Sequence, residues 1–162
     1  MNLSASRKFR EQAECELELL RRLLTEHTSL FEPPRSEPPS RMQILALAAV
    51  IHSFYTGVEN VFKRSAQAFD GGVPQSAMWH VALLNSMSSA SQSRPAVISG
   101  SLRTRLKKYL DFRHFFRHGY SFRLAWAQME PLVLDCAGTL DQFEAELRRF
   151  FDKIAAAHTD GD

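Results

Sequence analysis

Apolar residues recur every three or four positions along most of the chain, which is the spacing that places them on one side of an α-helix. A first helix is predicted from Ser4 or Ser6, either of which can serve as its N-cap, to about His27. Four prolines between Phe31 and Pro39 predict a loop after this helix. The apolar stripe of the helix consists of Phe9, Ala13, Leu17, Leu20 and Leu24.

A second and longer helix is predicted from Arg41 to Phe69. Its apolar positions include Ile44, Leu47, Val50, Ile51, Phe54, Val58 and Phe62. Asp70-Gly71-Gly72 should end this helix, because glycine adopts the left-handed conformation that closes many helices. Pro74 is expected to open a third helix that runs to about Ala90. Its expected packing residues are Met78, Trp79, Val81, Ala82 and Leu83.

Two more helices are predicted in the second half of the chain. One runs from Ser99 or Ser101 to Gly119, and its apolar side is made of Leu102, Leu106, Tyr109 and Leu110. The last helix should carry Pro131 in its first turn, where a missing N–H costs little. Its stripe either packs inside the bundle or forms a seam between two subunits. The stripe consists of Leu132, Cys136, Leu140, Phe143, Leu147, Phe150 and Ile154.

These elements predict an all-α, up-and-down bundle of four to five helices that forms one domain, residues 1–162. The core of the domain is expected at about 41–157, with helix 4–28 and the Pro-rich loop 31–39 as N-terminal additions. Hydrophobic residues make up 44% of the chain, but no apolar run reaches the length of a membrane span. The N-terminal segment lacks the hydrophobic region of a secretory signal, so a cytoplasmic protein without membrane contact is expected. Cys15 and Cys136 are far apart and are expected to be buried free thiols.

Basic residues are concentrated in one segment, although the net charge is only +2. Between residues 103 and 123 seven basic side chains accompany a single acid, Asp111, so this segment carries +6 and the remainder −4. A cationic segment is typical of a surface that binds an anion such as RNA, or of a solvated helix face. Asp111 is expected to pair with a neighbouring basic residue. The candidate RNA contacts are Arg103, Lys107, Arg117 and Arg123.

The end of this basic segment, residues 113–120, combines a guanidinium with two imidazoles and a phenol. An imidazole can take a proton from a ribose 2′-hydroxyl or return one to the leaving 5′-oxygen. A guanidinium can stabilise the negative charge of the pentacoordinate phosphorane. Together these groups favour cleavage of RNA without a metal or another cofactor. An ideal helix turns by ~140° over the five residues from Arg113 to His118. Either the helix unwinds at Gly119, or a second subunit completes the cleft.

The pattern Arg113-His114-x-x-x-His118-x-Tyr120 resembles the R-x4-H-x-Y motif of HEPN-domain ribonucleases, and in particular of HepT-type toxins. The segment FYTGVENVFK, residues 54–63, resembles an early helix of the same relatives. This resemblance covers most of residues 41–155. It implies that Arg113 and His118 are the catalytic pair, with His114 as the supporting polar residue. It also implies a homodimer in which two motifs face one cleft.

The resemblance further implies a partner and a mode of regulation. In HepT systems a nucleotidyltransferase antitoxin attaches AMP to the tyrosine that Tyr120 matches. The added phosphate and bulk would repel and exclude RNA. The chain is therefore interpreted as the endoribonuclease toxin of a toxin–antitoxin pair, with tRNA as one candidate substrate. The alternatives are a HEPN module that binds RNA, a nucleotide or a nucleotidyltransferase without cutting, and a purely structural bundle.

Glu59 lies among apolar neighbours on the second predicted helix and is a candidate supporting residue. It could pair with Arg113 or Arg117 and orient the site, or with Lys63 one turn along its own helix. Packing or structural roles are expected for Phe115, Phe116, His52, His80, Trp79 and Trp126. No metal is expected, because no carboxylate or cysteine cluster accompanies the two histidines of the motif.

Overall fold

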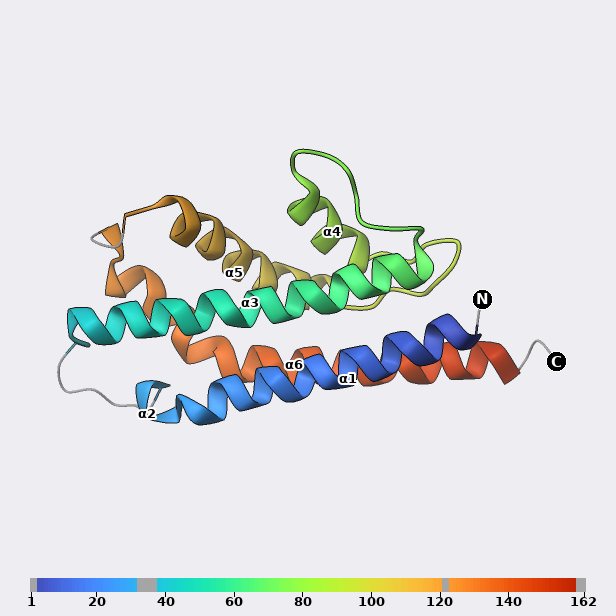
Figure 1. Ribbon diagram of the computed structural model, residues 1–162, viewed down its shortest axis with the longest axis horizontal. Helices are drawn as coiled ribbons and strands as arrows, with labels where there is room; N and C mark the ends of the chain where they lie inside the picture. Colours follow the sequence, from blue (N-terminus) through green and yellow to red (C-terminus); the bar gives the residue numbers. More distant parts are fainter. Residues whose placement is uncertain (1–2, 32–37, 121–122, 160–162) are drawn as a thin grey trace.

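The computed structural model describes residues 3–31, 38–120 and 123–159, and within these residues it contains helices and no strand (Figure 1). The all-α bundle expected from the sequence is therefore confirmed. Five helices have at least nine residues, and α2 is a single turn. The helices are α1 (Leu3–Glu26), α2 (Thr28–Phe31), α3 (Arg41–Phe69), α4 (Trp79–Met87), α5 (Gly100–His118) and α6 (Trp126–Thr159).

Three long helices, α1, α3 and α6, run along the long axis of the molecule (Figure 1). The start of α1 and the end of α6 lie at the same end, so these two helices are antiparallel. The shorter helices α4 and α5 pack on the side of α3 that faces away from α1. The motif at the end of α5 therefore lies in the layer formed by α3, α4 and α5.

The core among the three long helices is apolar and rich in phenylalanine. Phe9 of α1 meets Phe69 of α3 and Phe150 of α6 edge to face, with ring centres 5.5 and 6.0 Å apart. Edge-to-face contacts of this kind add stability beyond the area that the rings bury. Every residue of the apolar stripe on α6 is buried. That stripe therefore packs inside the bundle, which is the first of the two roles predicted for it.

Helix α3 has the bounds predicted from the sequence. Ser40 caps its start, since the Ser40 hydroxyl accepts a hydrogen bond from the Gln43 N–H while the Gln43 side chain accepts one from the Ser40 N–H. At the other end Gly71 has a φ of 76°, and the Asp70 N–H donates to the Ala66 carbonyl. Glycine makes this left-handed turn without a steric penalty, as the sequence predicted.

Among the described helices, α3 alone is long and apolar enough to pass a length and hydropathy test for a membrane span. In its most apolar window, however, 61% is buried inside the protein. Burial of this kind is expected of the central helix of a bundle, which is apolar on most of its circumference. The apolar character of α3 is thus explained by its central position.

Helix α4 is shorter than predicted at both ends. It begins at Trp79, after Pro74 and Met78, and it ends at Met87. The reason at its C-terminal end is competition for its last carbonyl groups. The Met87 carbonyl accepts hydrogen bonds from the N–H groups of Val97 and Ile98, and Arg94 binds the Ser86 carbonyl. These partners come from the following loop, so a longer helix is not needed to satisfy them.

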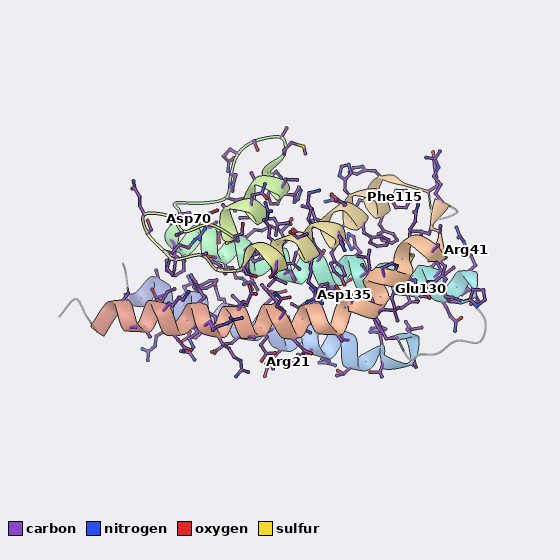
Figure 2. All side chains as sticks on the ribbon, turned by 180° about the vertical axis from the view of Figure 1, so that it is seen from behind. Arg21, Arg41, Asp70, Phe115, Glu130 and Asp135 are labelled. Atoms are coloured by element: carbon purple, nitrogen blue, oxygen red, sulfur yellow. The ribbon has the colours of Figure 1, made fainter. Side chains whose placement is uncertain are left out.

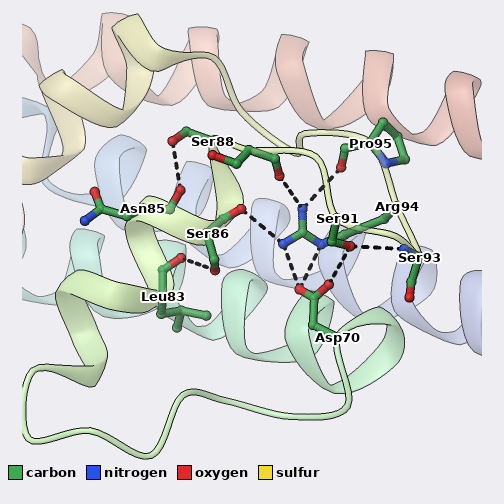
Figure 3. Close-up of polar contacts among 10 residues, drawn as sticks. Asp70, Leu83, Asn85, Ser86, Ser88, Ser91, Ser93, Arg94 and Pro95 are labelled. Atoms are coloured by element: carbon green, nitrogen blue, oxygen red, sulfur yellow. Dashed lines mark hydrogen bonds and ion pairs between the residues drawn. The ribbon is translucent and has the colours of Figure 1, made fainter.

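Arg94, a residue of that loop, binds Asp70 and several backbone carbonyl groups around it (Figure 3). Its guanidinium is almost fully buried and pairs with Asp70 at the end of α3, with Nε and Nη2 at 2.9 and 2.7 Å from Asp70 Oδ2. Nη1 donates to the carbonyl groups of Ser89 and Pro95. The charge pair fixes the connection between α4 and α5 to the end of α3.

The prediction that Pro131 lies in the first turn of the last helix is wrong, since α6 begins at Trp126 and contains Pro131 in its interior. Proline there removes one backbone hydrogen bond. Met129 is fully buried and Trp126 is packed against the core, so burial of the early turns outweighs that loss. The first helix also begins earlier than predicted, at Leu3, so that Ser4 and Ser6 lie inside it.

Three side chains expected in the interior are exposed: Cys15, Met78 and Phe115. Cys15 lies two positions from Ala13 and Leu17 of the buried α1 stripe, and a helix turns such a position toward solvent. Cys136 is buried as predicted, and burial raises the pKa of its thiol to about 12. Most of the predicted Pro-rich loop, residues 32–37, lies outside the described residues.

Candidate functional site

A pocket of about 420 Å³ lies between α5 and the start of α4. One wall is formed by α5 and the other by residues 77–81. The α5 residues in the lining are Lys107, Leu110, Asp111, Arg113, His114, Arg117 and His118. The pocket therefore joins the basic segment and the motif at its end in one concave surface.

The pocket brings Arg113 and His118 together, as the motif requires. Helix α5 remains helical through His118, so the two residues line one pocket without the unwinding before Gly119 that was one expectation. His114, Arg117 and His118 lie three and four positions apart on the pocket face, and the buried Arg113 also lines the pocket. The rings of His114 and His118 are neighbours, with centres 4.7 Å apart.

Gly119 ends α5 directly after the motif histidine. Its N–H donates to the Phe115 carbonyl at 2.7 Å, and its backbone then turns into an extended conformation. A Cβ at this position would lie 2.8 Å from the same carbonyl oxygen. The close approach of Gly119 to the last turn of α5 therefore favours glycine here, at the point where the helix ends and the chain turns toward Tyr120.

Beneath the pocket, Glu59 of α3 holds Arg113 in place. The Glu59 side chain is only 1% exposed, and its Oε1 lies 2.9 Å from Nη1 of Arg113 and 3.4 Å from Nζ of Lys63. His80 of α4 donates from Nδ1 to Glu59 Oε2 at 2.5 Å. Of the three partners predicted for Glu59, Arg113 and Lys63 are found, whereas Arg117 lines the pocket instead. With His80 as a further partner, a single carboxylate joins α3, α4 and α5.

The pKa of Glu59 reflects two opposing effects. Burial alone would raise it, but the hydrogen bond from His80 and the adjacent Arg113 guanidinium outweigh burial and lower the pKa below its usual value. Glu59 is therefore a carboxylate and balances the positive charge of Arg113. The contact between Arg113 Nη1 and Glu59 Oε1 is close but not aligned as a hydrogen bond, so this nitrogen retains hydrogen-bonding capacity.

His80 and Trp79 are site residues that the sequence analysis assigned to structural roles. Both line the pocket, and their rings stack with centres 3.5 Å apart. Lys63 Nζ lies 5.5 Å from the centre of the Trp79 ring, which is close enough for a cation–π interaction. The Trp-His pair near the start of a helix was visible in the sequence, but sequence spacing cannot show that it faces α5.

The predicted RNA contacts are not all found at the pocket. Lys107 and Arg117 line it, whereas Arg103 donates to the side chain of Asn85 at 3.3 Å and Arg123 lies outside the lining. Asp111 accepts both hydrogen bonds of the Lys107 ammonium, which confirms its expected local pairing. Only part of the basic segment therefore contributes positive charge to the pocket.

The other residues around the end of α5 have mixed environments. Tyr120 is 69% exposed, and Phe115 is 36% exposed at the same end of the bundle as Arg41 and Glu130 (Figure 2). The prediction that Phe115 is a core residue is therefore wrong. Burial and the positive charges of Arg113 and Arg117 lower the pKa of His52, whose ring lies 5.3 Å from that of Phe116.

Among the described residues no group of three or more His, Cys, Asp or Glu side chains is arranged to hold a metal ion. The carboxylates nearest the motif already have basic partners. Glu59 is bound by Arg113, Lys63 and His80, and Asp111 by Lys107. The polar groups that line the pocket are guanidinium, ammonium and imidazole groups, together with the Asp111 carboxylate.

The all-α bundle carries an Arg–His motif at the end of a basic helix, beside a pocket that the motif residues line, which is the arrangement expected of an HEPN-type protein. A family model described as "HepT-like protein" matches residues 46–154. This match covers α4, α5, most of α3 and most of α6, so the chain belongs to the HepT-like family. No curated protein and no solved structure matches the chain.

Proposed function

We propose that this chain is a metal-independent endoribonuclease of the HepT-like family, in which Arg113 and His118 act on the scissile phosphate. The single observation that carries this proposal is that the two side chains line one pocket together with Lys107, His114 and Arg117. A guanidinium and an ammonium neutralise phosphate, and an imidazole transfers protons near neutral pH.

The proposed step is an internal displacement within RNA. The ribose 2′-oxygen attacks phosphorus, the bond from phosphorus to the 5′-oxygen breaks, and the products are a 2′,3′-cyclic phosphate and a 5′-hydroxyl. His118 takes the proton from the 2′-hydroxyl or delivers one to the 5′-oxygen. Arg113, held by Glu59, stabilises the charge that grows on the phosphorane oxygens. His114 supports these groups from the same face of α5.

The test is cleavage of RNA, including tRNA, by the purified protein in EDTA. His118→Ala and Arg113→Gln should each reduce the rate by about 100-fold or more, which is the usual contribution of such groups. His27→Ala is the matched control, because His27 contacts the Leu23 carbonyl on α1 and lies outside the pocket lining. Wild-type rates in both pocket variants would refute the proposal.

A second candidate function is an HEPN module that binds RNA or a nucleotide without cutting it. One observation favours it: Arg113 is 8% exposed and already faces a carboxylate, which leaves less of its charge for a phosphate. The same incubation in EDTA separates the two functions. A binder retards RNA in a native gel but leaves its length unchanged in a denaturing gel.

The proposed function includes a cytoplasmic homodimer that is regulated by a nucleotidyltransferase antitoxin. The Tyr120 side chain is exposed and follows α5 by two residues, which supports its role as the acceptor of AMP. Its hydroxyl oxygen would attack the α-phosphorus of ATP and release pyrophosphate. Wild-type protein should lose nuclease activity with antitoxin and ATP, whereas Tyr120→Phe should keep it. A Tyr120→Phe protein that is still silenced through modification contradicts this part of the proposal.

A further inference from the structure

The two walls of the pocket differ in chemistry. The α5 wall presents Lys107, Arg113 and Arg117, and its one carboxylate, Asp111, is bound by Lys107. The opposite wall is mainly apolar and aromatic. Its residues are Ala77, Met78, Trp79, His80 and Val81. A ligand that fits both walls has an anionic end and an apolar or aromatic end.

The aromatic part of the second wall is held rigidly. The Trp79 ring stacks on His80, and His80 is fixed by its hydrogen bond to the buried Glu59. Met78 precedes Trp79 and is 67% exposed, so an apolar side chain remains available beside the ring. A flat ring that enters the pocket would meet a surface that is already ordered, so binding would cost little conformational entropy in the Trp79 and His80 side chains.

The size of the pocket limits the ligand further. A volume of about 420 Å³ is in the lower part of the range for small-molecule sites. It suits one nucleotide, with a planar base, a sugar and one phosphate. A base within a duplex cannot enter such a pocket without leaving its pair and its stack.

We infer that this pocket binds a single unpaired nucleotide, with the base against Met78 and Trp79 and the phosphate against Arg113 and Arg117. Where that nucleotide is part of RNA, the inference rests on the proposed function and adds a subsite that selects unpaired positions. Trp79 and Met78 are then binding residues, and Trp79 is oriented through His80 and Glu59.

The inference is tested by calorimetric titration of the full chain with 5′-UMP, 5′-AMP, uridine and inorganic phosphate. Both nucleotides should bind at least tenfold more tightly than phosphate or uridine, because only they occupy both walls. Trp79→Leu keeps an apolar side chain but removes the ring, and should weaken nucleotide binding by about tenfold or more while phosphate binding is unchanged.

Two further variants keep this test decisive. Trp126→Leu is the matched control, because Trp126 is also partly buried against the core but lies outside the pocket lining. It should bind nucleotides like the wild type. Met78→Ser changes an exposed side chain, so this variant is expected to fold like the wild type. It should weaken nucleotide binding several-fold.

A competition experiment identifies the source of the nucleotide. A single-stranded oligoribonucleotide that displaces 5′-UMP, where its duplex does not, assigns the pocket to an RNA strand. Displacement by neither assigns it to free nucleotides. The inference is overturned if 5′-UMP and 5′-AMP bind no more tightly than phosphate, or if Trp79→Leu and Met78→Ser both bind them like the wild type.

Cleavage in EDTA, measured on the same preparations, reports separately on the nuclease. RNA cleavage without nucleotide binding would remove the subsite and leave the proposed function standing. Nucleotide binding that depends on Trp79 and Met78, without cleavage of any RNA, would support the subsite and contradict the nuclease.

Discussion

Replacing Glu59 by glutamine removes one charge from the centre of the site with almost no change of shape. The Arg113 side chain, which is 9% exposed, would then be buried without its anion. Loss of one partner from a buried ion pair costs ~3–5 kcal/mol. Lys63 and His80 are about one third exposed and can turn to water, so the lower end of that range applies.

The expected loss is therefore about 3 kcal/mol at pH 7, or roughly 6–12 °C in the midpoint of thermal unfolding for a domain of this size. It should depend on pH in a defined direction. Because the pKa of Glu59 is lowered in the folded protein, its contribution is present above the unfolded pKa of about 4.3 and is lost as the pH falls through the folded value.

The assay is thermal unfolding followed by circular dichroism at pH 7 and at about pH 3, below the usual glutamate pKa. Glu11→Gln, which neutralises an exposed carboxylate on α1, is the control for the loss of one negative charge. The difference between wild type and Glu59→Gln should be large at pH 7 and should shrink in acid. Equal midpoints at pH 7, or a difference that is the same at both pH values, would show that Glu59 does not stabilise the site as a carboxylate.

Other consequences of the structure can be measured in the same way. Asp70→Asn should leave the buried Arg94 guanidinium without its anion and should lower the free energy of unfolding by about 3 kcal/mol, seen as a lower urea midpoint; an unchanged midpoint would contradict the role of this pair. The lowered pKa of His52 means that the unfolded chain takes up a proton first as the pH falls below about 6.5. His52→Gln should therefore make the unfolding temperature less sensitive to pH between 7.5 and 5.5, and an equal slope would refute this. A thiol reagent should label Cys15 in the folded protein and Cys136 only on unfolding, because Cys136 is buried with a raised pKa; rapid labelling of both would be the opposite result.

The positions of the long helices could be predicted from the sequence because their signals are local. The bounds of α3 follow from a serine cap, a long apolar stripe and a glycine pair, all within the helix or next to it. The predicted bounds of α4 and α6 failed where contacts outside the helix decide. Arg94, Val97 and Ile98 of the following loop bind the last carbonyl groups of α4, and burial of Met129 in the core keeps the turn before Pro131 helical in α6.

For the site, the order of residues along the chain predicts the class of chemistry: a guanidinium and imidazoles at the end of a basic helix, with an acid on an earlier helix as a candidate partner. The packing of the helices was needed to show that Glu59 binds Arg113 and Lys63 together, and that Trp79 and His80 form the facing wall. The two kinds of information differ in the distance over which they act. Periodicity, caps and charge runs act over a few residues and can be read along the chain. The rotation of one helix against another is set by packing of the whole core, and it determines which side chains meet.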